Sequence, residues 1–164
     1  DVEKVALAAD GLLAGVRPGA AWFDLSTNAP SLVKKLSAAF AAKGADRVAL
    51  VTDAMPTVGT SLDRFDLVGR TIKLVDGRLM TEEGTLAGAH LDMASAVRNA
   101  VRLAKVPLED ALRAASLTPA RFLGVENERG AIVPGARADL AALTDKLTVA
   151  ATWIDGEIES YGVP

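Results

Sequence analysis

The chain has 164 residues, of which 50% are hydrophobic and 24% charged, a composition typical of a globular domain with a real core. Its net charge of -3 gives no basic surface for nucleic acid, and no apolar run reaches the ~18 residues of a membrane span. The absence of cysteine and the single histidine exclude disulfides, thiolate metal sites and a histidine-rich zinc site made by this chain alone. Since DVEKVALAAD also lacks a signal-peptide pattern, we expect a cytoplasmic protein.

The N-terminal region predicts a strand–helix–strand pattern. Helical spacing in residues 1–13 leads to a turn at 17–19, and AAWFDL predicts a strand over residues 20–25. A helix over residues 30–43 follows and ends at Gly44, before a second strand in DRVALVT. This order predicts a parallel βαβ unit.

Glycines punctuate residues 57–88. In RTIKLVDGRLM, apolar and polar residues alternate up to Asp76-Gly77, which predicts a hairpin turn. The next stretch, TEEGTLAGA, predicts a glycine-containing loop, in which Glu82 and Glu83 form a solvated pair.

Three helices and a β-rich tail are expected after this loop. Asp92 is a good N-cap for the first helix, Pro107 opens the second, and the third runs from Thr118-Pro119 to Gly124. In the second helix, the residues expected to face one way are Leu108, Ala111, Leu112 and Ala115. The tail predicts strands in GAIV, ADLAAL and TVAATWIDGEIES, with a turn at Pro134-Gly135 and a hairpin at 155–156.

Asp53 ends the apolar run RVALVT. Functional side chains in folds with parallel sheets lie just past the carboxyl ends of strands, where a carboxylate can bind a metal or act as a general base. Position alone leaves a second interpretation open, in which Asp53 is a helix N-cap or a turn former, as the proline in DAMP favours.

Other candidate residues have equally plain alternatives. Ser26 and Thr27 follow the first strand and either bind a ligand or cap the next helix. His90 lies between the glycine loop and a helix, where it is either a substrate contact or a solvated loop residue. Trp22 and Trp153 fall in strand patterns and are expected in the core.

From about residue 46 onwards, the chain resembles the N-acetylglucosamine-6-phosphate deacetylases of the amidohydrolase superfamily. The phrases that carry the resemblance are LVTDAMPTVG, GTLAGAHLDMASAVRN, LEDALRAASLTPARFLGV and GAIVPGARADLAAL, in that order. The family combines a distorted TIM barrel with a small β-sandwich. The resemblance implies an α/β fold made of partial TIM-barrel-type βα units and a C-terminal β-sandwich fragment.

The resemblance also implies roles for particular residues. Asp53 corresponds to the family's catalytic acid/base, which takes a proton from metal-bound water and passes it to the leaving amine. Leu86, Ala87 and Gly88 match the segment that lies over the substrate, an amino-sugar phosphate. His90 matches no family ligand.

The metal site implied by the resemblance is not supplied by this sequence. The family binds a divalent metal of the zinc type through a glutamate and two histidines, which lie upstream of the matching region. The place expected to hold a substrate-binding histidine reads DLSTNAP. We therefore expect no metal ligand set in this chain and no activity from the chain alone.

Residues 1–44 resemble a different family, the 3-hydroxyisobutyrate dehydrogenases, through DLSTNAP and its flanks. This resemblance implies that Ser26 and Thr27 lie near a nicotinamide cofactor, although the dinucleotide glycine fingerprint and the catalytic lysine region are missing. It predicts three segments: a Rossmann-like βα segment over 1–45, part of an amidohydrolase barrel over 46–128, and β-sandwich strands over 129–164.

Three functions follow from these observations. The first is a partial deacetylase that hydrolyses the N-acetyl amide of an amino-sugar phosphate. The alternatives are a non-catalytic chimeric α/β module for structure or interaction, and an NAD-binding dehydrogenase fragment. Because barrel strands without their barrel expose unpaired edges, we also expect homo-oligomers.

Overall fold

The computed structural model describes residues 2–18, 21–22, 35, 38–39, 42 and 47–159. The N-terminal elements are α1 (Val2–Leu7), the 3₁₀ helix η1 (Leu12–Gly15), β1 (Ala21–Trp22) and β2 (Arg47–Val48). The middle of the chain contains β3 (Arg64–Leu67), β4 (Arg70–Val75), β5 (Arg78–Thr81), α3 (Met93–Arg102), α4 (Leu108–Ala115) and α5 (Leu117–Leu123). The C-terminal strands are β6 (Leu140–Leu143), β7 (Val149–Ile154) and β8 (Glu157–Glu159).

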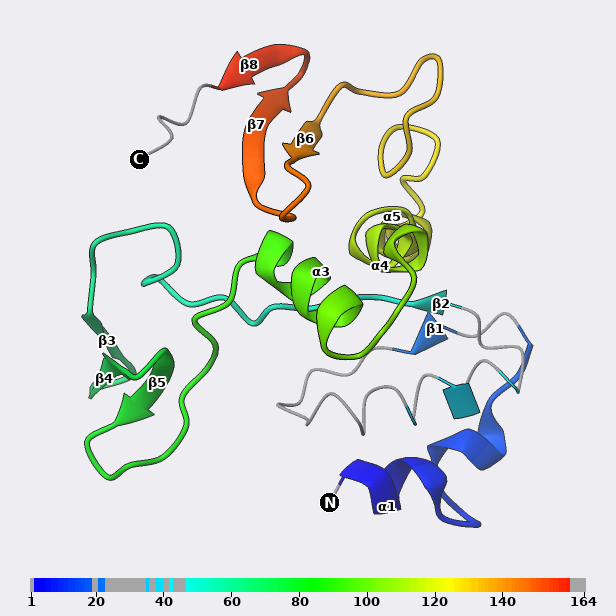
Figure 1. Cartoon of the computed structure of the whole chain (residues 1–164). Coiled ribbons are helices and arrows are strands. Elements are labelled where there is room, and N and C mark those ends of the chain that lie inside the picture. Colours follow the sequence, from blue (N-terminus) through cyan, green and yellow to red (C-terminus); the bar gives the residue numbers. More distant parts are fainter. Residues whose placement is uncertain are drawn as a thin grey trace.

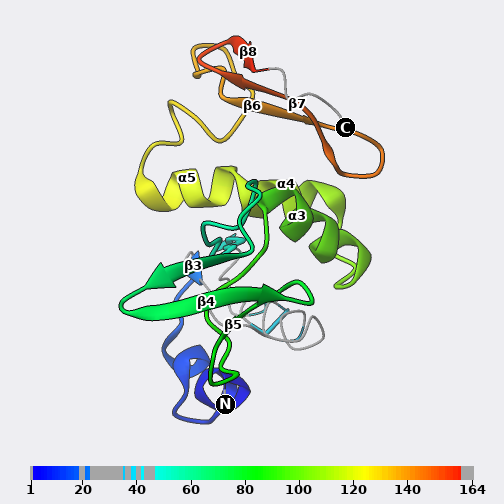
Figure 2. The same ribbon diagram turned by 90° about the vertical axis from the view of Figure 1, so that its left-hand side faces the viewer.

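The described elements form a mixed α/β arrangement with three small sheets, in the strand orders β1-β2, β3-β4-β5 and β6-β7-β8. The helices α3, α4 and α5 form a layer with the β6–β8 sheet on one side and the other two sheets on the opposite side (Figures 1 and 2). Arg98 and Arg102 of α3 connect this layer to the C-terminal sheet, because they donate to the carbonyls of Leu147 and Lys146 in the β6–β7 turn.

The predicted parallel pairing of the first two strands is confirmed, although both strands are short. Ala21 pairs with Arg47 and Trp22 with Val48 in parallel register. The second strand ends early because the N–H of Leu50 donates to the carbonyl of Ala114 in α4, at 2.9 Å, rather than to a strand. Within the predicted helix over 30–43, residues 35, 38 and 39 are described and are helical, and the N–H of Ala42 donates to the carbonyl of Ala38 at 3.0 Å. The other residues of this helix, its end at Gly44, Ser26 and Thr27 lie outside the described residues, as does the Trp22 side chain.

The β3–β5 sheet is an antiparallel meander with one apolar face. Phe65 pairs with Ile72, and Leu74 pairs with Leu79. Ile72 and Leu79 are buried, while the opposite face is polar, as the period of two along a strand requires. The predicted Asp76-Gly77 turn is confirmed, with φ values of 49° and 74° that match the type I′ hairpin.

The stretch expected to be a loop, TEEGTLAGA, turns after β5 and runs back beside it. The N–H of Thr81 donates to Thr85, and the N–H of Ala87 donates to Leu79, both at 2.8 Å. Gly84, at φ 81°, makes the turn between the two runs. The predicted loop is confirmed, since β5 ends at Thr81 and only an isolated antiparallel bridge between Met80 and Leu86 accompanies the return.

The helix boundaries confirm most of the predicted caps. Asp92 caps α3, Pro107 precedes α4, and Gly124 ends α5 at φ 72°. The predicted face of α4 was wrong, because Ala111 and Ala114 are its buried residues while Leu108 and Leu112 are exposed. Small side chains let α4 pack closely between α3 and α5. None of the helices in the described ranges is long and apolar enough to cross a membrane.

The C-terminal sheet forms as predicted except at its start. The turn at Pro134-Gly135 and the hairpin at Asp155-Gly156 are present, and β7 pairs with both β6 and β8. GAIV is not a strand, because Gly130, at φ 94°, turns the chain against α5, where an added Cβ would lie 2.6 Å from the Ala120 Cβ. Trp153 is half-buried rather than in a closed core.

The β3–β4 turn is the place where the backbone conformation and the residue type agree least. Val68 has φ 49° and is 94% exposed, followed by Gly69 at φ 74°. A β-branched residue is strained in the left-handed region, whereas Asn-Gly is the preferred pair for this turn. We expect Val68→Asn to raise the free energy of unfolding by about 0.5–1 kcal/mol, measured by urea denaturation.

Val75→Asn is the matched control for this change. Val75 is also an exposed valine beside a hairpin turn, but it lies within β4, where asparagine is disfavoured. A similar gain in both variants would show that the effect comes from surface polarity and not from relief of backbone strain.

Candidate functional site

Asp53 lies on an irregular segment that continues from β2. Its backbone has φ 51°, a left-handed conformation that aspartate tolerates better than most residues. The side chain is exposed, and among the described residues the carboxylate has no hydrogen-bond or ion-pair partner. No helix begins between residues 54 and 92, so the N-cap interpretation of Asp53 was wrong.

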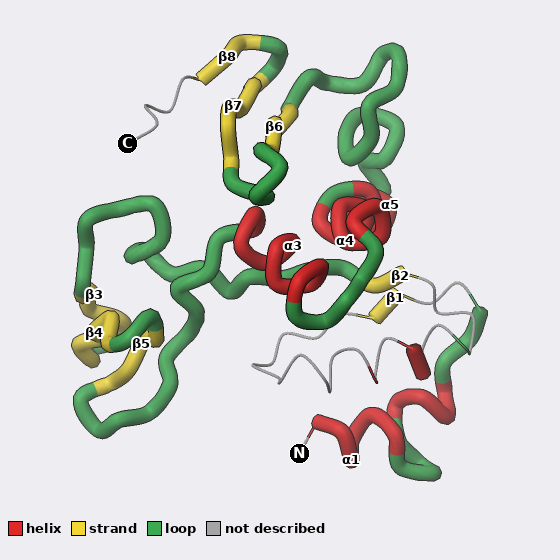
Figure 3. Tube along the Cα trace, in the orientation of Figure 1, coloured by secondary structure: helices red, strands yellow, loops and turns green. Residues whose placement is uncertain are grey.

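Two backbone hydrogen bonds join the Asp53 segment to the glycine-containing loop. The N–H of Ala89 donates to the Asp53 carbonyl, and the N–H of Met55 donates to the Ala89 carbonyl, both at 3.1 Å. They form an isolated parallel bridge between Ala54 and Ala89. The chain thus places Asp53 beside Gly88 and Ala89, at the end of the segment Leu86–Gly88, although both runs are irregular loops in Figure 3.

Gly88 permits this close approach. It has φ 91°, and a Cβ built on it would lie 2.6 Å from the Cγ and 3.1 Å from the Sδ of Met55. Any larger residue would push Met55 away and strain the backbone at the same time. Of the three predicted loop residues, Leu86 is exposed, whereas Ala87 and Gly88 are half-buried.

Thr57 and His90 add a side-chain contact to the same pairing. Thr57 Oγ1 and His90 Nδ1 lie 2.9 Å apart and share a hydrogen bond. Thr57 is 1% exposed, whereas His90 is exposed. His90 is therefore an exposed loop residue, as one of its two interpretations expected, and one of its ring nitrogens is also held by a buried hydroxyl.

Asp92 fixes the chain directly after this contact. Its Oδ1 accepts from the N–H of Ser95 at 2.8 Å, which starts α3. Partial burial raises the pKa of this carboxyl, but hydrogen bonds from the Ser95 hydroxyl and backbone N–H outweigh that effect, so its pKa lies below the usual range. The Asp92 carboxylate therefore stays ionised at neutral pH and holds the N-terminal end of α3, which follows His90 in the chain, in place.

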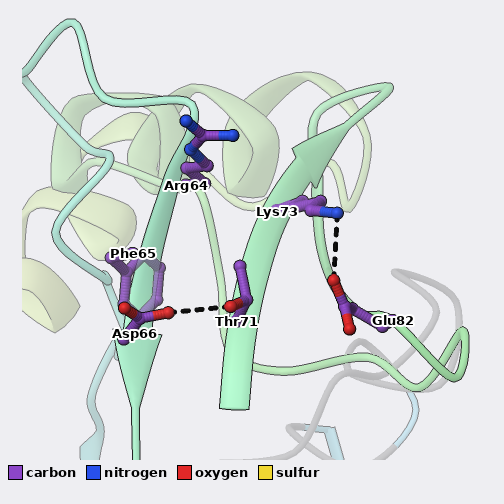
Figure 4. A pocket seen from close by; sticks show the side chains of 6 residues that line it. All are labelled: Arg64, Phe65, Asp66, Thr71, Lys73 and Glu82. Atoms are coloured by element: carbon purple, nitrogen blue, oxygen red, sulfur yellow. Dashed lines mark hydrogen bonds and ion pairs between the residues drawn. The ribbon is translucent and has the colours of Figure 1, made fainter. Parts of the chain in front are cut away.

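A hollow of about 420 Å³ lies elsewhere, on the polar face of the β3–β5 sheet. Asp66 accepts from Thr71 at 2.8 Å, and Lys73 pairs with Glu82 at 3.1 Å, so these side chains bind one another (Figure 4). The charges around it are balanced, with two basic and two acidic side chains. The residues that line it are Arg64, Phe65, Asp66, Thr71, Lys73 and Glu82. None of the predicted site residues is among them, so we regard the hollow as a solvated sheet surface.

The predicted acidic loop pair is solvated, as expected. Glu82 and Glu83 are both exposed. A hydrogen bond from Thr81 lowers the pKa of Glu83, which therefore remains charged near neutral pH.

Within the described ranges, no group of three or more histidine, cysteine, aspartate or glutamate side chains is placed to hold a metal ion. Asp53 has neither a second carboxylate nor an imidazole among its hydrogen-bonding neighbours there. The described part of the chain therefore does not fit a complete metal centre.

The structure brings together most of the predicted site and adds residues that the sequence did not indicate. Asp53, Gly88 and His90 lie along one pairing, while the positions of Ser26 and Thr27 are outside the described residues. Thr57 was missed because a threonine in a Pro-Thr-Val-Gly turn is ordinary turn chemistry. The sequence offered one signal for such a residue, the single histidine, because a histidine with a fixed ring needs a hydrogen-bonding partner.

Comparisons with known proteins identify the class to which this site belongs. A sequence model of the amidohydrolase family matches residues 9–158, nearly the whole chain. The chain therefore belongs to the amidohydrolase family.

Its relatives within that family include deacetylases of amino-sugar phosphates. The chain is 35% identical over 148 residues to a putative N-acetylgalactosamine-6-phosphate deacetylase of Escherichia coli strain K12, covering 90% of this chain and 89% of the relative. The same identity and coverage of this chain hold for N-acetylgalactosamine-6-phosphate deacetylase of Escherichia coli O157:H7, of which 39% is covered. The crystal structure of N-acetylglucosamine-6-phosphate deacetylase from Pasteurella multocida matches with a TM-score of 0.74 and 31% identity, over 82% of this chain and 34% of that one.

These matches extend across the place where we expected a join between two families. The amidohydrolase match starts at residue 9, so it includes most of the segment 1–44. A non-catalytic chimera is therefore not favoured. The dehydrogenase resemblance of residues 1–44, with its nicotinamide-binding roles for Ser26 and Thr27, is not tested by these comparisons and stays a prediction, as do the three segment boundaries.

The contact between Gly88 and Met55 provides a test of the pairing. We expect Gly88→Ala to lower the free energy of unfolding by about 1–3 kcal/mol, because the new methyl group clashes with Met55 and φ 91° becomes strained. Urea denaturation measures the loss. Amide hydrogen exchange at Ala89 and Met55 should accelerate in parallel, because their N–H groups form the bridge.

Gly59→Ala separates the two causes. Gly59 also has a positive φ, of 72°, but an added Cβ would meet no atom within 4 Å. This control should show the backbone strain alone and leave exchange at Ala89 unchanged. Equal losses in the two variants would contradict close packing of Gly88 on Met55.

Proposed function

We propose that this chain carries the acid/base part of an amino-sugar-phosphate deacetylase, which hydrolyses the N-acetyl amide of N-acetylglucosamine 6-phosphate or N-acetylgalactosamine 6-phosphate. The single observation behind the proposal is the exposed Asp53 carboxylate, held beside the segment Leu86–Gly88 by the Ala89 hydrogen bonds. The family and the relatives support the reaction class. Because the chain spans only 39% and 34% of two of the proteins it matches, the activity of a whole enzyme is part of the proposal.

Asp53 has the chemistry that amide hydrolysis needs. A carboxylate accepts a proton from water while the water oxygen attacks the acetyl carbonyl carbon. The same group then returns the proton to the nitrogen as the C–N bond breaks, which releases acetate and a free amine. An exposed carboxylate without a competing ion pair among the described residues is available for both transfers.

The segment Leu86–Gly88 is proposed to cover the sugar. Gly88 brings its backbone within contact distance of the Asp53 segment, and Leu86 presents an exposed apolar side chain. A ligand between Asp53 and this segment would be shielded from water on one side, which favours orderly proton transfer.

The amidohydrolase family is generally metal-dependent, and we propose a zinc-type divalent ion for the complete enzyme. Such an ion polarises the carbonyl and acidifies water when it is bound. The described residues do not supply its ligands, so they would have to come from other residues, and the role proposed for Asp53 does not depend on where they lie.

We further propose that the helices and the paired segments around Asp53 correspond to partial βα units of a TIM barrel over residues 46–128. The sheet β6–β8 corresponds to β-sandwich strands over residues 129–164. The similarity to the deacetylase crystal structure supports this assignment. A cytoplasmic location, expected from the sequence, also stays a prediction.

Acetate release from the two amino-sugar phosphates, measured with added divalent metal, tests the function. In the protein that carries this sequence together with a metal ligand set, we expect Asp53→Asn to lower kcat by about 10²- to 10⁴-fold with little change in KM. The 164-residue chain alone should release no acetate. Activity that survives Asp53→Asn would contradict the acid/base role.

Glu83→Gln is the matched control for that substitution. Glu83 is also an exposed carboxylate in the neighbouring loop, but it belongs to no proposed contact with the substrate. Its kcat should equal that of the unchanged protein, and a comparable loss would point to a general charge effect.

We also propose that the chain forms homo-oligomers through its C-terminal sheet. The strand β8 lies at the edge of that sheet, and its Ile158 is 61% exposed. An edge strand with an exposed apolar side chain between two glutamates can pair with another copy, whereas lysine at that position opposes pairing. We expect light scattering to detect a dimer or larger species that Ile158→Lys converts to monomer.

Glu159→Lys changes the charge of the same strand without removing an apolar side chain, so it should weaken association less than Ile158→Lys. A monodisperse monomer of the unchanged chain would contradict the proposed oligomer.

A further inference from the structure

The contact between Thr57 and His90 is separate from the two backbone hydrogen bonds of the pairing, and the proposed hydrolysis does not use it. Thr57 Oγ1 lies 2.9 Å from His90 Nδ1, and the two residues are 33 positions apart in the chain. Thr57 is 1% exposed, so packing fixes its hydroxyl. A fixed hydroxyl bound to Nδ1 restricts rotation of the imidazole and sets the direction of the ring.

The second ring nitrogen is the part of His90 that a ligand can meet. Since Nδ1 is engaged by Thr57, Nε2 remains as the other polar atom of a residue that is exposed. In a neutral imidazole, Nε2 is a donor or an acceptor depending on the tautomer. A hydroxyl group complements either form, because it both donates and accepts.

The place of His90 along the pairing limits which part of a sugar it can reach. It follows Ala89, whose N–H and carbonyl bind the Asp53 and Met55 backbones. An N-acetyl group bound at Asp53 lies at carbon 2 of the sugar, and its nearest polar neighbours are ring hydroxyls. The phosphate lies at the opposite end of the molecule, on carbon 6.

We propose that His90 contacts a hydroxyl group of the sugar ring through Nε2, and that Thr57 is the positioning residue that holds the imidazole for this contact. The proposal rests on the proposed function, because it uses the sugar placed between Asp53 and Leu86–Gly88. It assigns a ligand-binding role to a histidine that has no counterpart in the family resemblance.

Nuclear magnetic resonance on the full 164-residue chain tests the contact directly, because the single histidine gives one set of imidazole signals. The probes are N-acetylgalactosamine 6-phosphate, N-acetylgalactosamine and inorganic phosphate. We expect saturable shifts of the imidazole signals with the sugar phosphate, the same shifts at higher concentration with the plain sugar, and none with inorganic phosphate.

The other outcomes each contradict a different statement. Equal imidazole shifts with inorganic phosphate would overturn the contact with a ring hydroxyl. Shifts of the Gly88 and Ala89 amides without imidazole shifts would overturn the role of His90 and leave the proposed function standing. No shift with any probe would overturn both.

Two substitutions of His90 distinguish a ligand contact from a purely structural one. The amide of glutamine can replace Nε2, whereas the amide of asparagine can replace Nδ1 and keep the bond to Thr57. A ligand contact predicts tighter sugar-phosphate binding by His90→Gln than by His90→Asn. The reverse order would show that the histidine only joins the two segments.

Thr57→Val tests the positioning role, because valine keeps the volume and removes the hydroxyl. We expect about three- to tenfold weaker binding of the sugar phosphate, the value of one hydrogen bond. Thr118→Val is the matched control, since Thr118 is another buried threonine, in α5. The affinity of this variant for the sugar phosphate should be unchanged. Unchanged affinity in Thr57→Val, with the fold intact by circular dichroism, would overturn the positioning role.

Discussion

The pairing of Ala89 with the Asp53 segment is the interaction on which the candidate site depends. Two backbone hydrogen bonds hold together segments that are otherwise irregular, and neither belongs to a named strand. Irregular backbone has few partners of its own, so these bonds determine where the Asp53 carboxylate lies relative to Leu86–Gly88. Gly88 allows the two segments to approach closely, and the Thr57–His90 hydrogen bond joins them at a further point. The site is therefore one connected unit.

The rest of the fold keeps the two segments in place from opposite ends. The Asp53 segment is tied to the helical layer because Leu50 donates to Ala114 at the end of α4. The loop segment is tied to β5 at Ala87 and to α3 through the Asp92 cap. The β3–β5 meander lies between the paired segments in sequence. Its two hairpins reverse the chain, so that Ala89 comes back beside Ala54.

The sequence predicted the parts of the fold that local chemistry determines. Asp92 as a cap and the Asp76-Gly77 turn each need only neighbouring residues, and the structure confirms both. The turn at Val68-Gly69 was not predictable in this way, because valine disfavours the conformation it adopts. The buried face of α4 and the loss of a strand in GAIV depend on contacts with α3 and α5, which no local pattern contains. The Thr57–His90 bond likewise joins residues that are distant in sequence, so the sequence could indicate the histidine but not its partner.

Asp53 shows why its two interpretations from the sequence were not true alternatives. The φ of 51° means that the backbone at this position favours aspartate, asparagine or glycine, as the turn interpretation required. Yet the pairing with Ala89 uses the Asp53 carbonyl and leaves the carboxylate exposed beside the glycine-containing loop. One residue therefore satisfies a conformational demand and presents an acid/base group. Asparagine meets the first requirement without the second, so the chemistry of the side chain can be separated from the bend that positions it.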